Sequence, residues 1–452
     1  MGLVLVGAGL ERWEDVYAWP VDASWYRVTE QAGSDGRTMI EFGCQNFAPV
    51  EFAEVPDRPR IFVVGGSTTF GFPERPVGTE PLRGSPYGVV GALEAALSPG
   101  VEVVNLGVNG GTSEDTLRLV RRAMAWGPSG IVVYDGSNEV MAVPQHFSAG
   151  LWRFALYRRF AGLAPRATES PGWVGPASYG DDAHFSAVVS QFRHNLDATV
   201  ALARAAGVPI VLATQARNLV DFDPSWSTEG PTGSLATASD AEVEAALAAA
   251  PRSAEAAFEA GRRRRATGGD ARAAFIAAVD EDGMPFRVST AINGAILHAG
   301  ALGDARVVVA DAEAAVGALP GDDEFYDWIH PRPAAAEKIA AAILVGMRES
   351  GMISGAVGAP VHAFVPDAAV DLREAASWLQ WACVRRQDPA HRLAEADRWA
   401  LAAMPGPEAD AMHGIIDVLA GRAEHVLIAD PALAERLGHI HACVARALAP
   451  TP

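Results

Sequence analysis

The chain has 452 residues, of which 49% are hydrophobic and 20% charged, and its formal net charge is -19 at pH 7. This is a globular composition in a chain longer than one ordinary domain, so it predicts two or three folded parts. The negative charge argues against nucleic acid as a partner, because phosphates would be repelled. It also provides no attraction to anionic lipid.

The cysteines and the first residues indicate a reducing compartment. Cys44, Cys383 and Cys443 lie far apart, without metal-ligand spacing and in odd number, which is typical of free buried thiols. The apolar run at residues 1–10 is too short to cross a bilayer, and no basic residue precedes it as in a secretory signal. We interpret this run as a short strand or helix, and expect a cytoplasmic protein without a stable membrane span.

Short apolar runs alternate with helical stretches through most of the chain. The runs are rich in β-branched residues, which is typical of strands buried on both faces of a parallel sheet. The alternation predicts an α/β fold with a doubly wound, flavodoxin-like parallel sheet of five strands. The expected strands lie within residues 60–66, 101–107, 130–136, 208–214 and 306–311, and the expected helices within 87–97, 113–126, 185–206, 290–303 and 333–349.

Two segments depart from this alternation. A Ser/Thr/Gly-rich loop and Ala-rich helices occupy residues 224–286, and one helix–turn–helix there has about the length of a tetratricopeptide unit. The last hundred residues contain amphipathic helices and no clear strand. The expected organisation is an N-terminal extension (1–59), a first part of the α/β domain (60–223), a helical tetratricopeptide-like insertion (224–286), a second part of the α/β domain (287–352) and a C-terminal helical domain (355–452).

A serine follows the first expected strand, in the run Gly65-Gly66-Ser67-Thr68. Ligands of doubly wound sheets bind at the carboxyl ends of the strands, and the glycines permit a tight turn there. Such a loop could present a nucleophile or cradle a phosphate. The Gly-Lys-Ser/Thr of phosphate-binding loops does not follow, which weakens the second interpretation.

The second and third expected strands also end in polar turns that contain glycine. Gly107 can offer a backbone N–H, and Asn138 can offer a side-chain amide. Because both strands end at the same edge of the sheet, we expect these groups to face Ser67. Two such donors would stabilise a tetrahedral oxyanion. Taken alone, either turn would indicate only a chain reversal.

Asp327 and His330 lie three residues apart, after the last expected strand. Pro331 disfavours helix at His330, and Pro333 suits the first turn of the next helix. The pair should therefore lie on a short, rigid loop. There Asp327 could fix the imidazole tautomer while His330 deprotonates a serine.

In this order of Ser, Gly, Asn and Asp-x-x-His, the chain resembles the SGNH hydrolases, also called GDSL-type esterases and lipases, over about residues 60–350. The resemblance implies no metal and no other cofactor. Gly66 stands where that family often has Asp, outside the triad. The roles implied are a catalytic triad of Ser67, Asp327 and His330, and an oxyanion hole formed by the Ser67 N–H, Gly107 and Asn138.

Within that family, the chain looks like the hydrolases that carry a tetratricopeptide-like insertion, on the evidence of residues 136–139, 218–224 and 280–287. These stretches supply three substrate-binding candidates: Arg287, Asn218 and Glu139. The Arg287 guanidinium could clamp a carboxylate or phosphate, or pair with Asp280 or Asp282. Asn218 could contact substrate, or serve in a turn or helix cap.

The sequence thus favours a metal-independent serine hydrolase that cleaves a small acyl ester through an acyl-enzyme. One alternative is an acyltransferase that passes the acyl group to an alcohol or amine in glycan or natural-product synthesis; a helical roof that excludes water would favour it. A second is a non-catalytic binding or scaffold protein that uses its helical segments for protein partners. The expected ligand is a small-molecule ester or acyl donor, not a nucleic acid.

Overall fold

The computed structural model describes residues 26–44, 47–75, 86–139, 182–225, 227–230, 235–301 and 305–361, together with parts of 370–438. The chain divides into two compact units. The larger consists of Met1–Glu229 and Ala250–Phe364, and the smaller of Gly230–Ala249 and Val365–Pro452.

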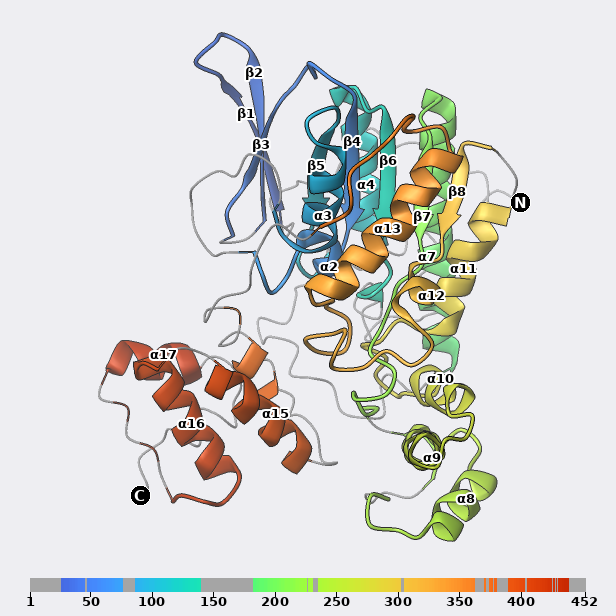
Figure 1. The fold of residues 1–452 in the computed structure, drawn as a ribbon, viewed down its shortest axis with the longest axis vertical. Coiled ribbons are helices and arrows are strands. Elements are labelled where there is room, and N and C mark those ends of the chain that lie inside the picture. Colours follow the sequence, from blue (N-terminus) through green and yellow to red (C-terminus); the bar gives the residue numbers. More distant parts are fainter. Residues whose placement is uncertain are drawn as a thin grey trace, which may run out of the picture. The chain divides into compact units, whose positions relative to one another are not determined.

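A five-stranded parallel sheet forms the centre of the larger unit, with the order β5-β4-β6-β7-β8 (Figure 1). This order confirms the predicted flavodoxin-like, doubly wound sheet. Each strand falls within a predicted run, because consecutive β-branched residues suit a strand buried on both faces. The strands are β4 (Arg60–Gly65), β5 (Glu102–Gly107), β6 (Gly130–Tyr134), β7 (Ile210–Ala213) and β8 (Val307–Ala310).

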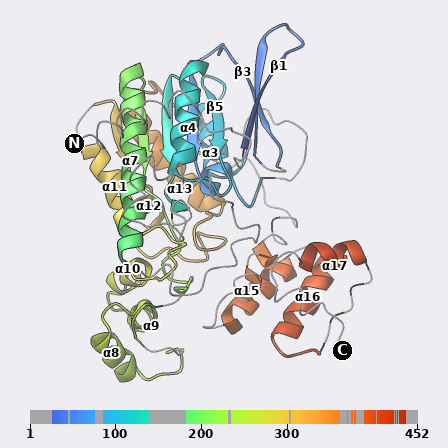
Figure 2. The ribbon, with the colours of Figure 1, turned by 180° about the vertical axis from the view of Figure 1, so that it is seen from behind.

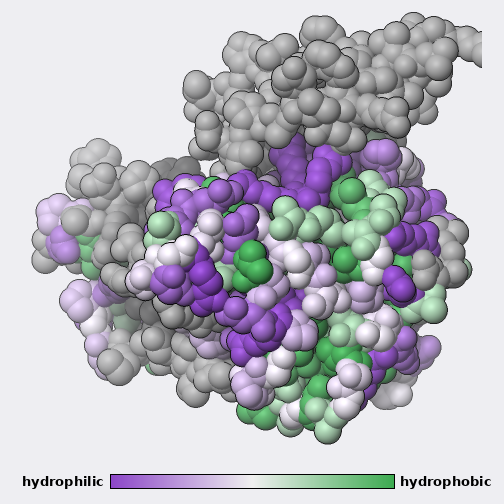
Figure 3. Space-filling view, turned by 90° about the horizontal axis from the view of Figure 1, so that it is seen from above, coloured by the Kyte–Doolittle hydropathy of each residue, from purple (hydrophilic) through white to green (hydrophobic). Residues whose placement is uncertain are grey.

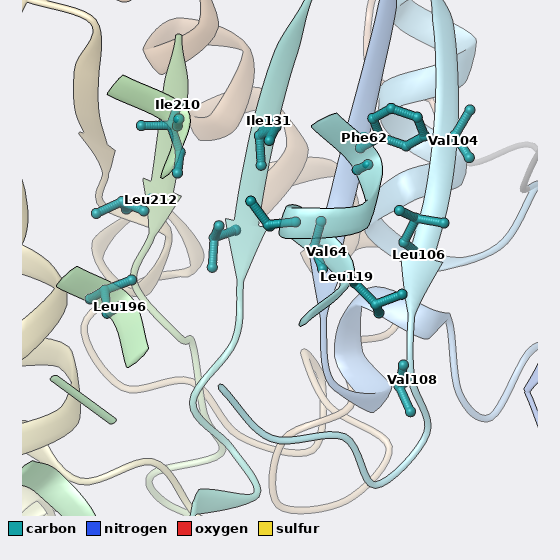
Figure 4. Close-up of a cluster of buried hydrophobic side chains, with 14 of the residues drawn as sticks. Phe62, Val64, Val104, Leu106, Val108, Leu119, Ile131, Leu196, Ile210 and Leu212 are labelled. Atoms are coloured by element: carbon teal, nitrogen blue, oxygen red, sulfur yellow. The ribbon is translucent and has the colours of Figure 1, made fainter. Parts of the chain in front are cut away.

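Helices cover both faces of this sheet (Figures 1 and 2). Alternate residues of β4 enter two separate cores: Phe62 and Val64 join one, and Ile61 and Val63 the other. Figure 4 shows part of the first core. That core is covered by α4 (Ser113–Ala123), α7 (Asp182–Ala206) and α11 (Thr290–Ala301), and the second by α3 (Gly88–Leu97), α12 (Ala312–Val316) and α13 (Pro333–Glu349).

A second, antiparallel sheet was not predicted. Within the expected N-terminal extension, β1 (Tyr26–Ala32), β2 (Thr38–Cys44) and β3 (Val50–Ala53) pair in that order. Its signal is an alternation of period two: Ile40, Phe42 and Cys44 are buried while the residues between them are partly exposed. The buried side chains join the core under α4. The strand or helix expected at residues 1–10 lies outside the described residues.

The predicted insertion contains α9 (Ala254–Ala266) and α10 (Arg272–Asp280), which pack together within the larger unit. Phe258 and Phe275 meet edge to face between them, with ring centroids 5.4 Å apart. The preceding helix, α8 (Asp240–Ala249), is grouped with the smaller unit. A tetratricopeptide-like character of this segment stays a prediction.

The described part of the smaller unit is helical. Besides α8, it contains α15 (Pro389–Ala402), α16 (Pro407–Leu419) and α17 (Pro431–Gly438). His413 of α16 and Asp397 of α15 are joined by a hydrogen bond of 2.8 Å. Throughout the described residues, no helix is both long and apolar enough to cross a membrane. The face seen in Figure 3 mixes hydrophilic and hydrophobic side chains, as protein surfaces ordinarily do.

Candidate active site

Ser67 lies at the sharp turn from β4 into a short helix, α2 (Ser67–Phe70). Only glycine fits at Gly65, because a Cβ there would come within 2.0 Å of the Tyr134 main-chain oxygen. The turn therefore places Ser67 at the carboxyl edge of the sheet, as predicted from the strand before it. The residue is largely covered, with 5% of its surface exposed.

His330 lies between Ser67 and Asp327. Its Nε2 is 2.8 Å from Ser67 Oγ, and its Nδ1 is 2.6 Å from Asp327 Oδ2. The other carboxylate oxygen of Asp327 accepts the main-chain N–H groups of Ile329 and His330, each at 2.9 Å. The structure thus brings the three predicted residues into one line of hydrogen bonds. Such a line lets a carboxylate orient an imidazole that accepts a serine proton.

The loop that carries Asp327 and His330 is held in shape by a hydrogen bond between its own main-chain atoms. The Tyr326 N–H donates to the main-chain oxygen of His330 at 2.9 Å, and Pro333 begins α13 just beyond. The His330 ring also has aromatic neighbours: the centroid of Phe72 is 4.9 Å away and that of Trp328 is 5.8 Å away. These contacts restrict the imidazole to the orientation in which it meets Ser67.

Asn138 follows β6 and lies beside the turn that holds Ser67. Its Nδ2 donates to the main-chain oxygen of Gly111 at 2.8 Å. A Cβ on Gly66 would lie 2.9 Å from the same Nδ2. The amide therefore occupies the space next to Gly66, which accounts for a residue without a side chain at that position.

Gly107 does not have the predicted role. Its N–H donates to Asn105 Oδ1 at 2.8 Å, so it is not available to an oxyanion. A Cβ on Gly107 would come within 2.3 Å of the Phe70 nitrogen, which shows that this glycine is required for β5 to pack against α2. The prediction that Gly107 is an oxyanion donor is therefore wrong.

Gly110, three residues after β5, is the better candidate for a donor. It has φ of +78°, and nothing lies within 4 Å of a Cβ built on it. Within the described part of the chain, its N–H makes no hydrogen bond. The next residue, Gly111, receives the bond from Asn138, which places this turn beside the Ser67 turn. The sequence signal was the Asn109-Gly110 dipeptide, a common site of positive φ.

Glu139 was predicted to bind substrate, but it is only 2% exposed. Its two oxygens accept the N–H of Ser113 at 2.7 Å and the Ser113 hydroxyl at 2.8 Å. Burial, and then the nearby Asp135 carboxyl, raise the pKa of Glu139 to about 8. The side chain thus caps the start of α4, and the prediction is corrected accordingly.

Asn218 was a second substrate-binding candidate, and it is fully buried. Its Nδ2 donates to Asp322 Oδ1 at 2.8 Å and to the Asp327 main-chain oxygen at 3.1 Å. Its Oδ1 accepts the Asp221 N–H at 3.0 Å. With all its polar atoms bound inside the protein, Asn218 serves the turn role and not the substrate role.

Arg287, the third candidate, is also buried, with 1% exposed. One of its nitrogens lies 3.8 Å from Asp282 Oδ2, and its guanidinium lies 5.8 Å from the centroid of the Phe222 ring. Of the two alternatives left open, the structure therefore favours pairing with Asp282 over a substrate clamp.

No family model matches the chain, and no curated protein matches it. Among solved structures, it is similar to a lipolytic protein of the G-D-S-L family from Veillonella parvula, with 12% identity, a TM-score of 0.32, and coverage of 63% of this chain and 96% of the other. An acetylxylan esterase from Geobacillus stearothermophilus shows 15% identity and a TM-score of 0.32, with coverage of 66% of this chain and 97% of the other. A GDSL-like lipase from Bacteroides thetaiotaomicron shows 13% identity and a TM-score of 0.31, with coverage of 64% of this chain and 88% of the other. Likenesses this distant do not bear on substrate or reaction.

The larger unit has a doubly wound α/β fold with a parallel sheet of flavodoxin-like strand order. Three of the predicted motifs lie along the carboxyl edge of this sheet. Ser67 follows β4, Asn138 follows β6, and the Asp327–His330 loop follows β8. These positions are the ones expected from the sequence. Membership of the SGNH hydrolases, and of their subgroup with a helical insertion, stays a prediction.

Proposed function

We propose that the chain is a serine esterase that hydrolyses a small acyl ester. The observation that carries the proposal is the line of hydrogen bonds from Ser67 Oγ to His330 Nε2 at 2.8 Å and from His330 Nδ1 to Asp327 at 2.6 Å. A carboxylate on Nδ1 selects the tautomer whose Nε2 is free to accept a proton. His330 is then the general base, and Ser67 the nucleophile.

The reaction proceeds through two acyl transfers. Ser67 Oγ forms a bond to the ester carbonyl carbon as its proton passes to His330 Nε2. The tetrahedral intermediate collapses, the bond to the leaving alcohol breaks, and His330 returns the proton to that alcohol. Water then attacks the acyl-enzyme with His330 again as base, which releases the acid and restores Ser67.

Three donors are proposed to stabilise the oxyanion: the Ser67 N–H, the Gly110 N–H and the Asn138 amide. One Asn138 hydrogen is directed to the Gly111 oxygen, which leaves the second for the substrate. Donors placed in advance lower the barrier, and the loss of one typically costs about 100- to 1,000-fold in kcat.

A fluorophosphonate probe tests the proposal, because it reacts with an activated serine and leaves a covalent label. We expect the wild type to be labelled and to hydrolyse p-nitrophenyl acetate. Ser67→Ala should lose both properties, while a surface control such as Ser129→Ala keeps them. If the wild type is neither labelled nor active, the proposal fails and a non-catalytic binding function becomes the better explanation.

The same residues could serve acyl transfer, and one observation favours this second candidate. Ser67 and His330 are only 5% and 4% exposed, so water has restricted access to the acyl-enzyme. Alcohols and amines added to a reaction with p-nitrophenyl acetate would distinguish the two. Acylated acceptor in excess of free acetate would identify a transferase, and acetate as the main product an esterase.

A further inference from the structure

The loop that carries Asn138 has a buried carboxyl group at each end. Asp135 and Glu139 are 1% and 2% exposed. Asp135 Oδ2 accepts the Thr116 hydroxyl at 2.6 Å, and its Oδ1 accepts the Gly136 N–H at 2.8 Å. Because Glu139 accepts both donors of Ser113, the two ends of the loop are attached to the first turn of the same helix, α4.

The Ser113 hydroxyl is itself held in place from the opposite side. Asn195 of α7 donates its Nδ2 to Ser113 Oγ at 2.9 Å. Its Oδ1 accepts Gln191 Nε2, also at 2.9 Å. Since Ser113 Oγ accepts from Asn195, its own hydrogen is directed to Glu139. The carboxyl group thus ends a chain of oriented polar groups that extends into α7.

Asn138 adds a third attachment between these two. Its bond to the Gly111 oxygen reaches the residues just before α4, next to Gly110. Loop 135–139 is therefore fastened at three points to residues 111–116. The Asn138 amide and the Gly110 N–H, which lie on different strand ends, belong to one hydrogen-bonded unit.

The burial of these two carboxyl groups costs the folded state free energy. Burial is the main cause that raises the pKa of Asp135, to about 6, and of Glu139, to about 8. Asp115 of α4 raises both further, and the Arg287 side chain lines the same small cavity as Glu139. Carboxyl groups whose pKa values are shifted by burial cluster at functional sites.

We propose that Asp135 and Glu139 are positioning residues that hold the oxyanion donor Asn138 in place. The inference rests on the proposed esterase function. Oxyanion donors act only when they lie at hydrogen-bond distance from the charge that develops, and a shift of about 1 Å costs about 100-fold in rate. Release of the Glu139 end should move the adjacent Asn138, which acts on kcat and not on substrate binding.

A double-mutant cycle tests this inference on the full chain. Glu139→Ala should lower kcat for p-nitrophenyl acetate by about 10- to 100-fold, with KM within about twofold. In an Asn138→Ala background, Glu139→Ala should lower kcat by less than about threefold, because the donor that it positions is already absent. The end-point of fluorophosphonate labelling gives the number of competent molecules, so a loss of folded protein is not counted as a loss of kcat.

Three further variants complete the design. Glu139→Gln fills the same space and still accepts the Ser113 N–H, so it should restore most of kcat. Glu102→Gln is the structural control. Glu102 accepts a hydrogen bond from the buried Arg60 at 2.6 Å at the amino end of the sheet, so this substitution should lower stability and leave kcat unchanged. If Glu139→Ala does not fold, Ser113→Ala removes one hydroxyl from the same unit and should lower kcat about three- to tenfold with the same non-additivity.

The possible outcomes separate the inference from the proposed function. An active wild type in which Glu139→Ala leaves kcat unchanged overturns the inference alone. So does a loss of kcat that recurs in full in the Asn138→Ala background, because it would show a general effect on the fold. A wild type without labelling or hydrolysis overturns the proposed function, and this inference with it.

Discussion

The side-chain amide of Asn218 donates to the main-chain oxygen of Asp327 at 3.1 Å, so a residue after β7 holds the loop that carries the acid and base of the proposed triad. The same amide also donates to Asp322 at 2.8 Å. These two bonds fasten the start and the centre of the loop to a neighbouring strand end. The orientation of His330 therefore depends on Asn218. Because Asn218 is fully buried, it acts through this loop and not through contact with a substrate.

Asn218→Ala should consequently impair both activity and stability. The change removes the hydrogen bonds to the Asp327 oxygen and from the Asp221 N–H, which costs about 1–3 kcal/mol. We expect kcat to fall about tenfold, since a small displacement of the base is enough. Steady-state kinetics and thermal unfolding measure the two effects. Ser225→Ala, which removes a buried hydroxyl bonded to the Met284 oxygen, is the control and should change stability alone.

Gly66→Ala provides a test of the space beside Asn138. The new Cβ would lie 2.9 Å from Asn138 Nδ2, so the amide must shift away from residue 66. Because one oxyanion donor is then displaced, kcat should fall about 10- to 100-fold with little change in KM. Gly294→Ala is the matched control: nothing lies within 4 Å of its Cβ, and its kinetics should not change. Equal kinetics of the two variants would contradict a role for Asn138.

The sequence predicted the sheet, and the edge of it at which Ser67, Asp327 and His330 meet, because both follow from where the strands end. The β-branched runs determine where β4 to β8 lie. Asp327 and His330 are only three residues apart, so one short loop carries both. The antiparallel sheet at residues 26–53 was missed because its alternation of buried and exposed residues is short and less apolar. A scan for period-two alternation would have indicated it.

The wrong predictions about the site concern polar groups that already have hydrogen-bond partners inside the protein. Gly107, Asn218 and Glu139 were all placed at the correct edge of the sheet. Each is bound to a residue whose proximity follows only from the fold or from a side-chain rotamer, such as Asn105 beside Gly107. Burial and hydrogen-bond satisfaction are tertiary properties, so strand ends in a sequence indicate candidates without distinguishing donors from supports.

Gly107→Ala should act through packing and not through the oxyanion. Its Cβ would come within 2.5 Å of the Phe70 Cα and closer still to the Phe70 nitrogen, and backbone atoms cannot yield as a flexible side chain can. We expect a loss of about 3 kcal/mol or more in the free energy of unfolding, with activity lost in parallel. Chemical denaturation gives the first quantity. A Gly107→Ala protein as stable as the wild type would contradict this explanation.

The pH dependence of stability should reveal the ionisation of Glu139. Its pKa is raised from 4.5 to about 8 in the folded protein, chiefly by burial. The folded state therefore holds this proton more tightly than the unfolded state. The associated stabilisation is complete below pH 4.5 and is lost as pH rises through about 8. The pKa of Asp135 is raised from 3.8 to about 6, so its contribution to stability is also lost as pH rises, but at lower pH than that of Glu139.

Glu139→Gln removes this ionisation while it keeps the shape of the side chain. Between pH 5 and 8, the Tm of the wild type should fall relative to that of Glu139→Gln, and the two curves should become parallel above about pH 9. Thermal unfolding followed by circular dichroism at intervals of half a pH unit measures the difference. Curves that remain parallel from pH 5 to 9 would show that Glu139 ionises in the folded protein as it does in the unfolded chain.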